Sequence, residues 1–223
     1  MENNSVQNPG EEKVFVSWSG GKDAYLSLLL AREQGLEIKS LLNFAGHDGY
    51  SRSHGLPRDL LERQAEALDL PLEKEEVTWE TYQEGFIRAV ERLKDKGMTG
   101  GVFGDINLEE HREWLEKMAR HCGFNCYLPL WGMGERQVTE ELVHRGVTAI
   151  IVSLKSELVK EEWLGQPLGQ KFLEYSEKAG ISPCGERGEF HTLVVDGPGF
   201  REPMQYRVVK KENKGERAIL RLA

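Results

Sequence analysis

The sequence predicts an α/β protein, with a parallel, doubly wound sheet that carries helices on both faces and a smaller C-terminal α+β region. Three observations support this prediction. Apolar runs of strand length alternate with segments of helical spacing from residue 14 to residue 154. Such alternation favours parallel strands joined by right-handed crossovers. Beyond residue 154 the alternation ends, and the pattern indicates one helix and a β-hairpin.

Each expected element has a local signal. The first strand is rich in β-forming residues, Gly35 suits the C-terminal cap of the first helix, and Pro57 opens the second helix. The expected strands cover residues 14–18, 38–44, 72–77, 101–104, 124–128 and 147–154. The expected helices cover residues 25–32, 57–68, 80–96, 108–122, 138–143 and 170–178. The expected hairpin joins 205–210 to 218–222 through a turn at 213–215.

Composition narrows the class of protein. We divide the 223 residues into a disordered tail (1–10), a first domain (11–150) and a C-terminal region (151–223). The net charge of −8 argues against binding to a nucleic-acid backbone, which needs a basic face. Three cysteines and a polar N-terminus without an apolar leader favour the cytoplasm. No apolar run reaches the roughly 20 residues that span a membrane. We expect no membrane partner, and a homodimer stays open.

The stretch Ser19-Gly20-Gly21-Lys22-Asp23 is the strongest functional signal in the chain. It stands between a strand and a helix, at the carboxyl end of the sheet, where α/β folds bind ligands. Glycine amides, the positive end of a helix and a lysine together form an anion site. A carboxylate suits such a site when it faces a metal ion. We therefore expect the phosphates of a nucleotide together with Mg²⁺; the alternative is a tight turn without a ligand.

The motif "SGGKDA" resembles the pyrophosphate loop S-G-G-x-D-S of the ATP pyrophosphatase superfamily, although Ala24 replaces the final serine. This resemblance implies an adenine nucleotide α-hydrolase-like (HUP-like) fold and cleavage of ATP between its α- and β-phosphates. It assigns Ser19, Gly20, Gly21, Lys22 and Asp23 to ATP, and Asp23 to the metal. It also implies that adenine lies near His54, in the loop after the second strand.

Three further blocks are similar to the diphthine–ammonia ligase family. They are "FGDINLEEHREWLEKMARHCGFNCYLPLWG" (103–132), "WLGQPLG" (163–169) and "CGERGEFHTLVVDGPGF" (184–200). The resemblance implies an enzyme that adenylates a carboxylate with ATP and amidates it with ammonia, releasing AMP and pyrophosphate. It also implies an acceptor: diphthine, a modified histidine of translation elongation factor 2.

The late block departs from the family pattern C-G-E-G-G-E-F/Y-E-T at two positions. Arg187 replaces a glycine, and His191 replaces a glutamate. These changes of charge leave open a second hypothesis, the same chemistry on a small molecule, as proposed for a branch linked to cobalamin salvage. A third hypothesis is sulfur or nitrogen transfer to transfer RNA, and the acidic charge argues against it. A fourth is an ATP-binding sensor without turnover, which Ala24 supports.

The resemblance assigns the late block to the acceptor and ammonia. Glu186 and Glu189 are expected to hold ammonia, position Mg²⁺ or act as a general base. Arg187 is expected to bind a substrate carboxylate or phosphate, with a surface salt bridge as the alternative. His191 is expected to carry a proton. The alternative for Glu186 and Glu189 is a solvated acidic turn, and the alternative for His191 is a hydrogen-bonded histidine at the start of a strand.

Three residues outside the late block complete the expected site. Gly104 and Asp105 follow a short strand, so they should face the ligand crevice near the ribose or the reactive phosphate. Asp105 could instead cap the next helix. Trp131 is expected to pack or to wall the substrate cleft. His111, at the start of the helix after Asp105, could reach a phosphate, although we favour a plain surface position for it.

Overall fold

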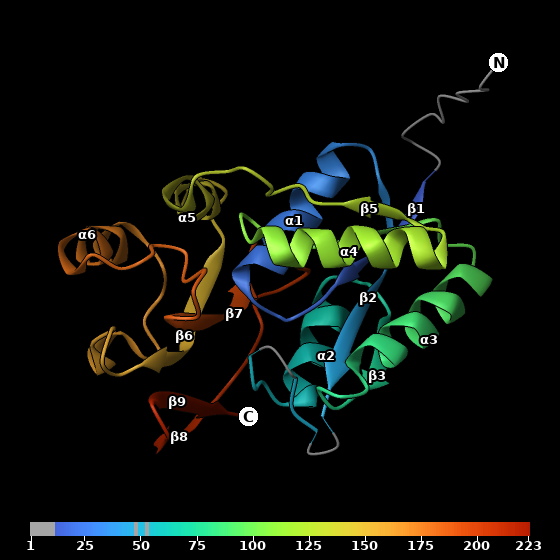
Figure 1. Cartoon of the computed structure of the whole chain (residues 1–223). Coiled ribbons are helices and arrows are strands. Elements are labelled where there is room, and N and C mark those ends of the chain that lie inside the picture. Colours follow the sequence, from blue (N-terminus) through green and yellow to red (C-terminus); the bar gives the residue numbers. More distant parts are fainter. Residues whose placement is uncertain (1–11, 47–48, 52–53) are drawn as a thin grey trace.

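The computed structural model describes residues 12–46, 49–51 and 54–223, so the expected tail at 1–10 lies outside the described residues. This part of the chain forms two sheets (Figure 1). The first sheet has five parallel strands in the spatial order β3-β2-β1-β4-β5. Its strands are β1 (Lys13–Ser17), β2 (Glu37–Ala45), β3 (Leu72–Glu76), β4 (Gly100–Val102) and β5 (Asn125–Tyr127).

Helices pack against both faces of this sheet. They are α1 (Lys22–Glu33), α2 (Arg58–Ala67), α3 (Tyr82–Asp95) and α4 (Glu109–Cys122). Val14 and Val16 share a buried cluster with α1 and α2, whereas Phe15 packs in a second cluster with α3 and α4. Successive side chains of a strand point to opposite faces, so the two clusters lie on opposite faces. The doubly wound parallel sheet is confirmed, and its switch point falls between β1 and β4.

The second sheet is antiparallel, with the order β7-β6-β9-β8. It consists of β6 (Thr148–Lys155), β7 (Phe190–Asp196), β8 (Val208–Lys214) and β9 (Arg217–Leu222), accompanied by α5 (Glu135–His144), a short 3₁₀ helix η2 (Glu161–Trp163) and α6 (Gln170–Ala179). Placing the strand 147–154 in the alternating parallel series was therefore wrong. An unbroken apolar run shows that a strand is buried, but it does not show the direction of its neighbours.

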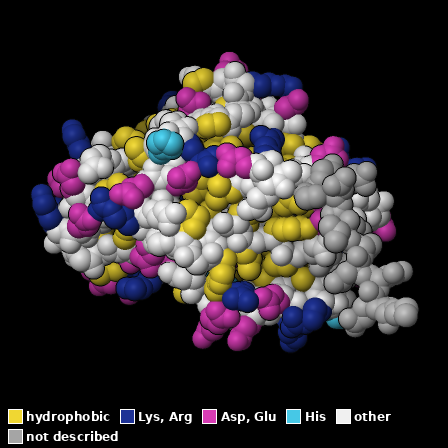
Figure 2. All heavy atoms as spheres, turned by 90° about the horizontal axis from the view of Figure 1, so that it is seen from above, with side chains coloured by type: hydrophobic (Ala, Val, Ile, Leu, Met, Phe, Trp, Pro, Cys, Tyr) yellow, Lys and Arg dark blue, Asp and Glu magenta, His cyan; other side chains and the backbone are white. Residues whose placement is uncertain are grey.

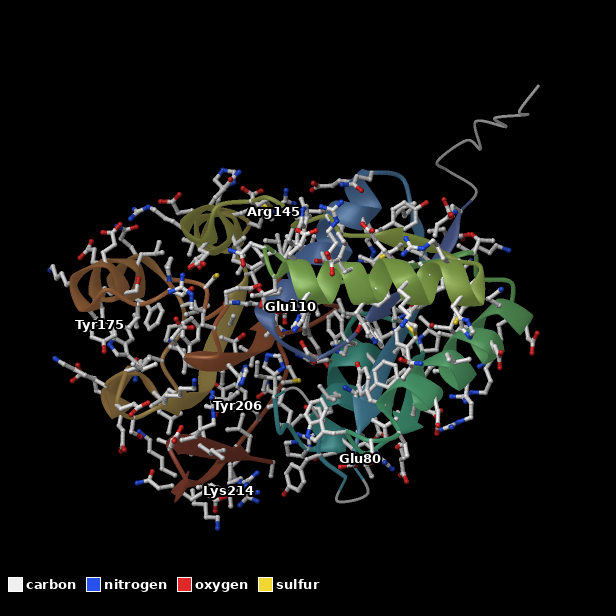
Figure 3. The ribbon with its side chains drawn as sticks, in the orientation of Figure 1. Glu80, Glu110, Arg145, Tyr175, Tyr206 and Lys214 are labelled. Atoms are coloured by element: carbon white, nitrogen blue, oxygen red, sulfur yellow. The ribbon has the colours of Figure 1, made fainter. Side chains whose placement is uncertain are left out.

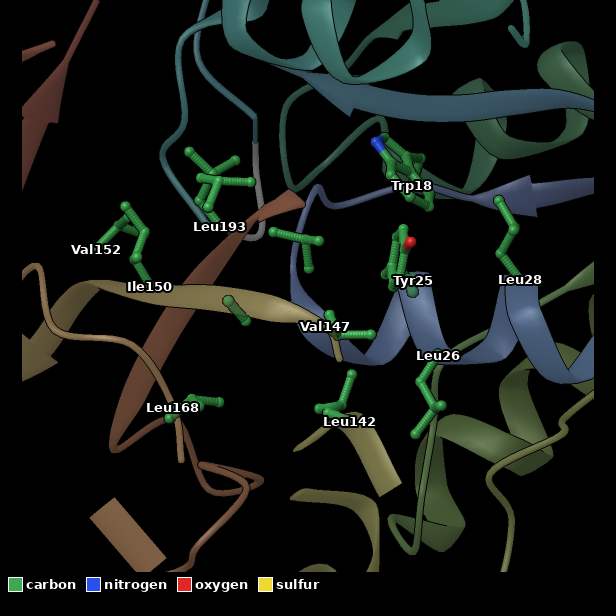
Figure 4. Packing of buried hydrophobic residues seen from close by; sticks show 14 of the residues in the cluster. Trp18, Tyr25, Leu26, Leu28, Leu142, Val147, Ile150, Val152, Leu168 and Leu193 are labelled. Carbon is green, nitrogen blue, oxygen red and sulfur yellow. The ribbon is translucent and has the colours of Figure 1, made fainter. Parts of the chain in front are cut away.

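The two sheets share one core around α1. Figure 4 shows Trp18, with Tyr25 and Leu26 of this helix, in one buried cluster with apolar residues of the second sheet region such as Val147 and Leu193. Our proposed boundary near residue 150 stays a prediction. The hairpin occurs, but its turn is the pair 215–216, slightly later than the expected turn at 213–215. Our sequence prediction did not include η2.

Backbone hydrogen bonds fasten β7 to the glycine loop at the end of β1. The amide of Val194 donates to the carbonyl of Gly20 at 3.0 Å, and the amide of Lys22 donates to Thr192 Oγ1 at 3.1 Å. The buried side chain of Gln64, on α2, joins both segments by donating to the carbonyls of Gly20 and Val194. The second sheet is thereby anchored at the place where the first sheet should bind its ligand.

Candidate active site

The glycine loop has a backbone that only glycine adopts easily. Gly20 has a φ of 80°, and a Cβ atom there would lie 2.5 Å from Leu61 Cδ2. A Cβ atom on Gly21 would lie 2.7 Å from His54 Nε2. Gly21 is the N-cap of α1 and has no capping side chain of its own, while Thr192 Oγ1 accepts the amide of Lys22. The loop therefore presents a helix N-terminus to the cavity, which is a favourable position for phosphate.

Lys22 and Asp23 form an ion pair at the start of α1. The Lys22 side chain is only 4% exposed, and its Nζ donates to both Asp23 carboxylate oxygens at 2.6 Å. Burial lowers the pKa of Lys22, but Asp23, Cys184 and Glu186 outweigh that effect and hold the pKa above its ordinary value. Lys22 is therefore a fixed positive charge at the start of α1.

A cavity of about 330 Å³ opens over this loop, at the carboxyl ends of β1, β2 and β4. We call it the main cavity. Its lining includes Ser19, Lys22 and Asp23 from the loop, and it also includes Asp105 and Glu186 from distant parts of the chain. The expected convergence of the glycine loop, the β4 end and the late block is thus present in the structure.

Gly104 and Asp105 follow β4 and line the main cavity, as expected from the carboxyl-end rule. A Cβ atom on Gly104 would lie 2.9 Å from the backbone of Asp23, so a glycine permits the close approach of these two segments. The Asp105 carboxylate lies 3.0 Å from His111 Nδ1. Asp105 is not a helix cap, because the N-cap of α4 is Leu108 and has no side-chain capping bond.

Glu186 is the acidic residue of the late block that faces the main cavity. Its carboxylate accepts a hydrogen bond from the backbone of Asn107. Burial, followed by the nearby negative charges of Asp23 and Asp105, raises the pKa of Glu186 to about 7, against the opposing effect of Lys22. A carboxyl group with this pKa can take up or release a proton near neutral pH.

Five predicted site residues do not line the main cavity: Gly20 and Gly21 of the loop, and Glu189, Arg187 and Trp131. Glu189 is 4% exposed, and its carboxylate accepts the backbone amides of Ser182 at 3.4 Å and Arg187 at 3.0 Å, so it shapes the late block from inside. The side chain of Arg187 is exposed. Trp131 packs against Arg112, whose guanidinium lies 5.1 Å from the centre of the Trp131 ring.

His191 and His54 line the main cavity side by side, with ring centres 4.7 Å apart. Burial, aided by Arg217 and Lys22, lowers the pKa of His191 to about 3. Burial and the neighbouring His191 likewise hold the pKa of His54 well below its ordinary value. Both rings are therefore neutral near pH 7, which suits hydrogen bonding to a ligand better than the predicted transport of a proton by His191.

An aromatic side pocket of about 330 Å³ adjoins the main cavity. It lies between α3 and α4, and its lining includes Trp79, Tyr82 and Trp114. Trp79, Tyr82 and His111 line both spaces. Our sequence analysis did not identify these aromatic residues. The carboxyl-end rule could have indicated Trp79 and Tyr82, because they follow the third strand.

The charge distribution agrees with a local anion site. Figure 2 shows acidic and basic side chains interspersed over the described part of one face, without a continuous basic stripe there. Within the described ranges, no helix is long and apolar enough to cross a membrane. A glycine loop at a helix N-terminus, a buried cation and a cavity at the switch point are the arrangement typical of nucleotide-binding α/β proteins of the pyrophosphate-loop class.

Comparison with known families gives a more specific assignment. The family model for the diphthamide synthase N-terminal domain matches residues 12–126, and the model for the diphthamide synthase C-terminal domain matches residues 135–222. The chain belongs to the diphthamide synthase family, and the family resemblance found in its motifs is confirmed.

Individual relatives are distant. The diphthine–ammonia ligase of Schizosaccharomyces pombe is 26% identical over 213 residues, covering 85% of this chain but only 35% of the yeast protein. The Rattus norvegicus diphthine–ammonia ligase is 25% identical over 216 residues, covering 85% of this chain and 81% of the rat protein. A solved structure named as a predicted subunit of tRNA methyltransferase from Methanocaldococcus jannaschii is 16% identical, with a TM-score of 0.48, covering 86% of this chain and 100% of that chain.

Proposed function

We propose that this protein is an ATP-dependent carboxylate–ammonia ligase, which makes an amide and releases AMP and pyrophosphate. One observation carries the proposal: Glu186 faces the phosphate loop and its Lys22–Asp23 pair across a single cavity. Membership of the diphthamide synthase family and the name of the relatives, diphthine–ammonia ligase, support it.

The first step is adenylation. An oxygen of the acceptor carboxylate attacks the α-phosphorus of ATP, and the bond to the β-phosphate oxygen breaks. Ser19, Gly20 and Gly21 at the start of α1 would hold the leaving pyrophosphate, and buried Lys22 would balance its charge. Holding carboxylate and phosphate together in one cavity lowers the entropic part of the barrier.

The donor set fits a magnesium ion that accompanies ATP. Asp23 offers a carboxylate that is 26% exposed and lines the main cavity. Among the described residues, no group of three or more His, Cys, Asp or Glu side chains is arranged to hold a metal ion. Magnesium commonly binds one or two carboxylates together with phosphate oxygens and water, so Asp23 would be its protein ligand. The ion would reduce the negative charge of the phosphates.

The second step is amidation. Ammonia attacks the acyl carbon of the adenylate, the bond from that carbon to the AMP oxygen breaks and AMP leaves, and the attached nitrogen must then lose one proton to give the neutral amide. Glu186 can accept that proton, because its pKa of about 7 leaves much of it ionised near neutral pH. His54 and His191, both neutral, can donate hydrogen bonds to the oxygen that gains charge.

We propose diphthine on an elongation factor 2-like protein as the acceptor, with the late block around Arg187 at the acceptor side. This choice follows the name of the relatives. A small-molecule acceptor, transfer to RNA and a non-catalytic sensor gain no support from the comparisons. Because such an acceptor takes part in translation, we propose a cytoplasmic location. A homodimer stays a hypothesis.

ATP labelled at the α- and γ-phosphates tests the proposal. With magnesium, ammonium and diphthine-bearing elongation factor 2, we expect labelled AMP, labelled pyrophosphate and amidated acceptor. Lys22→Ala and Asp23→Ala should abolish the products, whereas Lys39→Ala, which removes an exposed lysine on β2, should not. ADP and phosphate as products, or no products from the wild-type protein, would contradict the proposal.

A further inference from the structure

His111 and Asp105 form a hydrogen-bonded pair at the mouth of the site. His111 stands on the first turn of α4, its side chain is 61% exposed, and it lines both the main cavity and the side pocket. Its Nδ1 lies 3.0 Å from Asp105 Oδ1. When Nδ1–H donates to this carboxylate, the neutral ring keeps its lone pair on Nε2. The pair therefore presents an oriented base at an entrance that solvent reaches.

The proposed reaction needs such a base before the chemical step begins. Ammonia attacks through its lone pair, but near neutral pH most of it is present as ammonium, which has none. One proton must leave ammonium before the attack, and a second must leave the nitrogen after it. Glu186, beside the phosphate loop, is placed for the second proton.

The other ionisable groups lining the main cavity are poorly suited to the first proton. His54 and His191 have pKa values far below neutral, so they bind a proton too weakly. Lys22 is already charged and paired with Asp23. Tyr82 has a pKa raised to about 12 by burial and by Asp105, so it holds its own proton.

We propose that His111, oriented by Asp105, deprotonates ammonium at the mouth of the cavity and releases the proton to solvent. The N–H bond of ammonium breaks as a bond forms between that proton and His111 Nε2. Neutral ammonia then enters the main cavity, and the imidazolium loses the same proton to bulk water. This inference rests on the proposed ligase function.

The surroundings of His111 favour both an approaching cation and the uptake of a proton. The charged and titratable groups that face it are Asp105 after β4, Glu186 in the late block, Glu110 on α4 itself and Tyr82 on α3. Glu110 is labelled at the N-terminal end of α4 in Figure 3. The hydrogen bond to Asp105, and then the charges of Asp105, Glu186 and Glu110, raise the pKa of His111 against the effect of burial.

The aromatic rings of the side pocket give a second, independent attraction for ammonium. Trp79, Tyr82 and Trp114 line the pocket beside His111. The faces of such rings attract cations by about 0.5–2 kcal/mol, with tryptophan the strongest. Ammonium would therefore bind beside His111, the residue that removes its proton. Neutral ammonia is attracted less strongly by the aromatic rings and would leave that position more easily.

The test compares the dependence on ammonium at two pH values. We expect His111→Gln to raise the KM for total ammonium roughly 10²-fold at about pH 7. At about pH 9, where a larger share is free ammonia, the difference from wild type should nearly disappear. The KM for ATP should stay unchanged. Asp105→Asn should act in the same direction, because an amide no longer favours the required tautomer. His121→Gln, on the exposed far end of α4, is the matched control.

Two results would overturn the inference. One is an unchanged KM for ammonium in His111→Gln at about pH 7. The other is a loss that persists at about pH 9 or that falls on the KM for ATP, which would make His111 a nucleotide ligand. Failure of the proposed function is distinguishable, because the wild-type protein would then form no AMP and pyrophosphate at either pH.

Discussion

The two glycine-containing loops of the site are both held by side chains from other elements, but they differ in the space around their left-handed glycines Gly20 and Gly188. The loop at residues 19–23 is held by the buried side chains of Gln64 and Thr192, and its left-handed Gly20 is closely enclosed, with Leu61 2.5 Å from the place of a Cβ atom. The loop at residues 182–189 is held by buried side-chain contacts, in which Glu189 accepts two amides and Arg217 donates to the Gly188 carbonyl. A side chain therefore has no room at Gly20, whereas the space around Gly188 is open.

The largest expected effect compares one glycine from each loop. Gly20→Ala forces a side chain into a left-handed backbone and places its Cβ 2.5 Å from Leu61, so we expect a loss of about 3 kcal/mol in the free energy of unfolding. Gly188 has a φ of 75°, but nothing lies within 4 Å of the Cβ atom that Gly188→Ala would add, so we expect a loss of only about 1 kcal/mol in the free energy of unfolding. Urea unfolding measures both. Equal losses would contradict the contrast between the loops.

The second largest expected effect is on catalytic activity, and it distinguishes Glu186 from Glu189, the two acidic residues of the late block. Glu186→Gln keeps the size of the side chain but removes the base, so we expect turnover at saturating ammonium to fall roughly 10²-fold. Release of AMP, measured at constant ATP and acceptor, gives the turnover. Glu186→Gln should unfold at nearly the wild-type urea concentration. Full activity in this variant would remove Glu186 from the amidation step.

The corresponding substitution at the second acidic residue, Glu189→Gln, should lower the stability of the fold. Only one oxygen remains to accept the amides of Ser182 and Arg187, and a buried donor loses a partner. We expect a loss of about 1–2 kcal/mol in the free energy of unfolding. Chemical denaturation of the wild-type and variant proteins under the same conditions checks this value. A stable Glu189→Gln protein with a catalytic defect would mean that Glu189, and not only Glu186, contacts a substrate.

The smallest expected effect is a dependence on pH. The pKa of Glu186 is raised to about 7 in the folded protein, so the folded state binds a proton more tightly than the unfolded state. Its contribution to stability is therefore present at low pH and is lost as pH rises toward about 7. Because Glu186 is partly exposed, we expect this contribution to the free energy of unfolding to be about 1 kcal/mol. Urea unfolding at several pH values should show the free energy of unfolding of the wild-type protein, relative to that of Glu186→Gln, decreasing as pH rises from about 5 to about 8. A difference that does not change with pH would contradict the assigned pKa.

Sequence reasoning predicted the parallel sheet well because each strand and helix has a local pattern. It also predicted that Lys22, Asp105 and Glu186 face one ligand site, because all follow the carboxyl-end rule or a motif. It could not tell Glu186 from Glu189, since their orientation depends on Ser182 and on the packing of β7. It favoured a plain surface position for His111, because the role proposed here rests on a hydrogen bond across six residues and on a pocket between α3 and α4.

The bonds between β7 and the glycine loop have a consequence for modularity. A chain cut after the first sheet would leave the Gly20 carbonyl, the Lys22 amide and part of Gln64 without the partners that β7 supplies. It would also uncover the apolar side of α1 that packs against the second sheet. The nucleotide-binding half is thus not an autonomous unit that can be grafted onto a new acceptor region. If the exposed tip around Arg187 contacts the acceptor, as we propose, changes there would alter the acceptor and leave this junction intact.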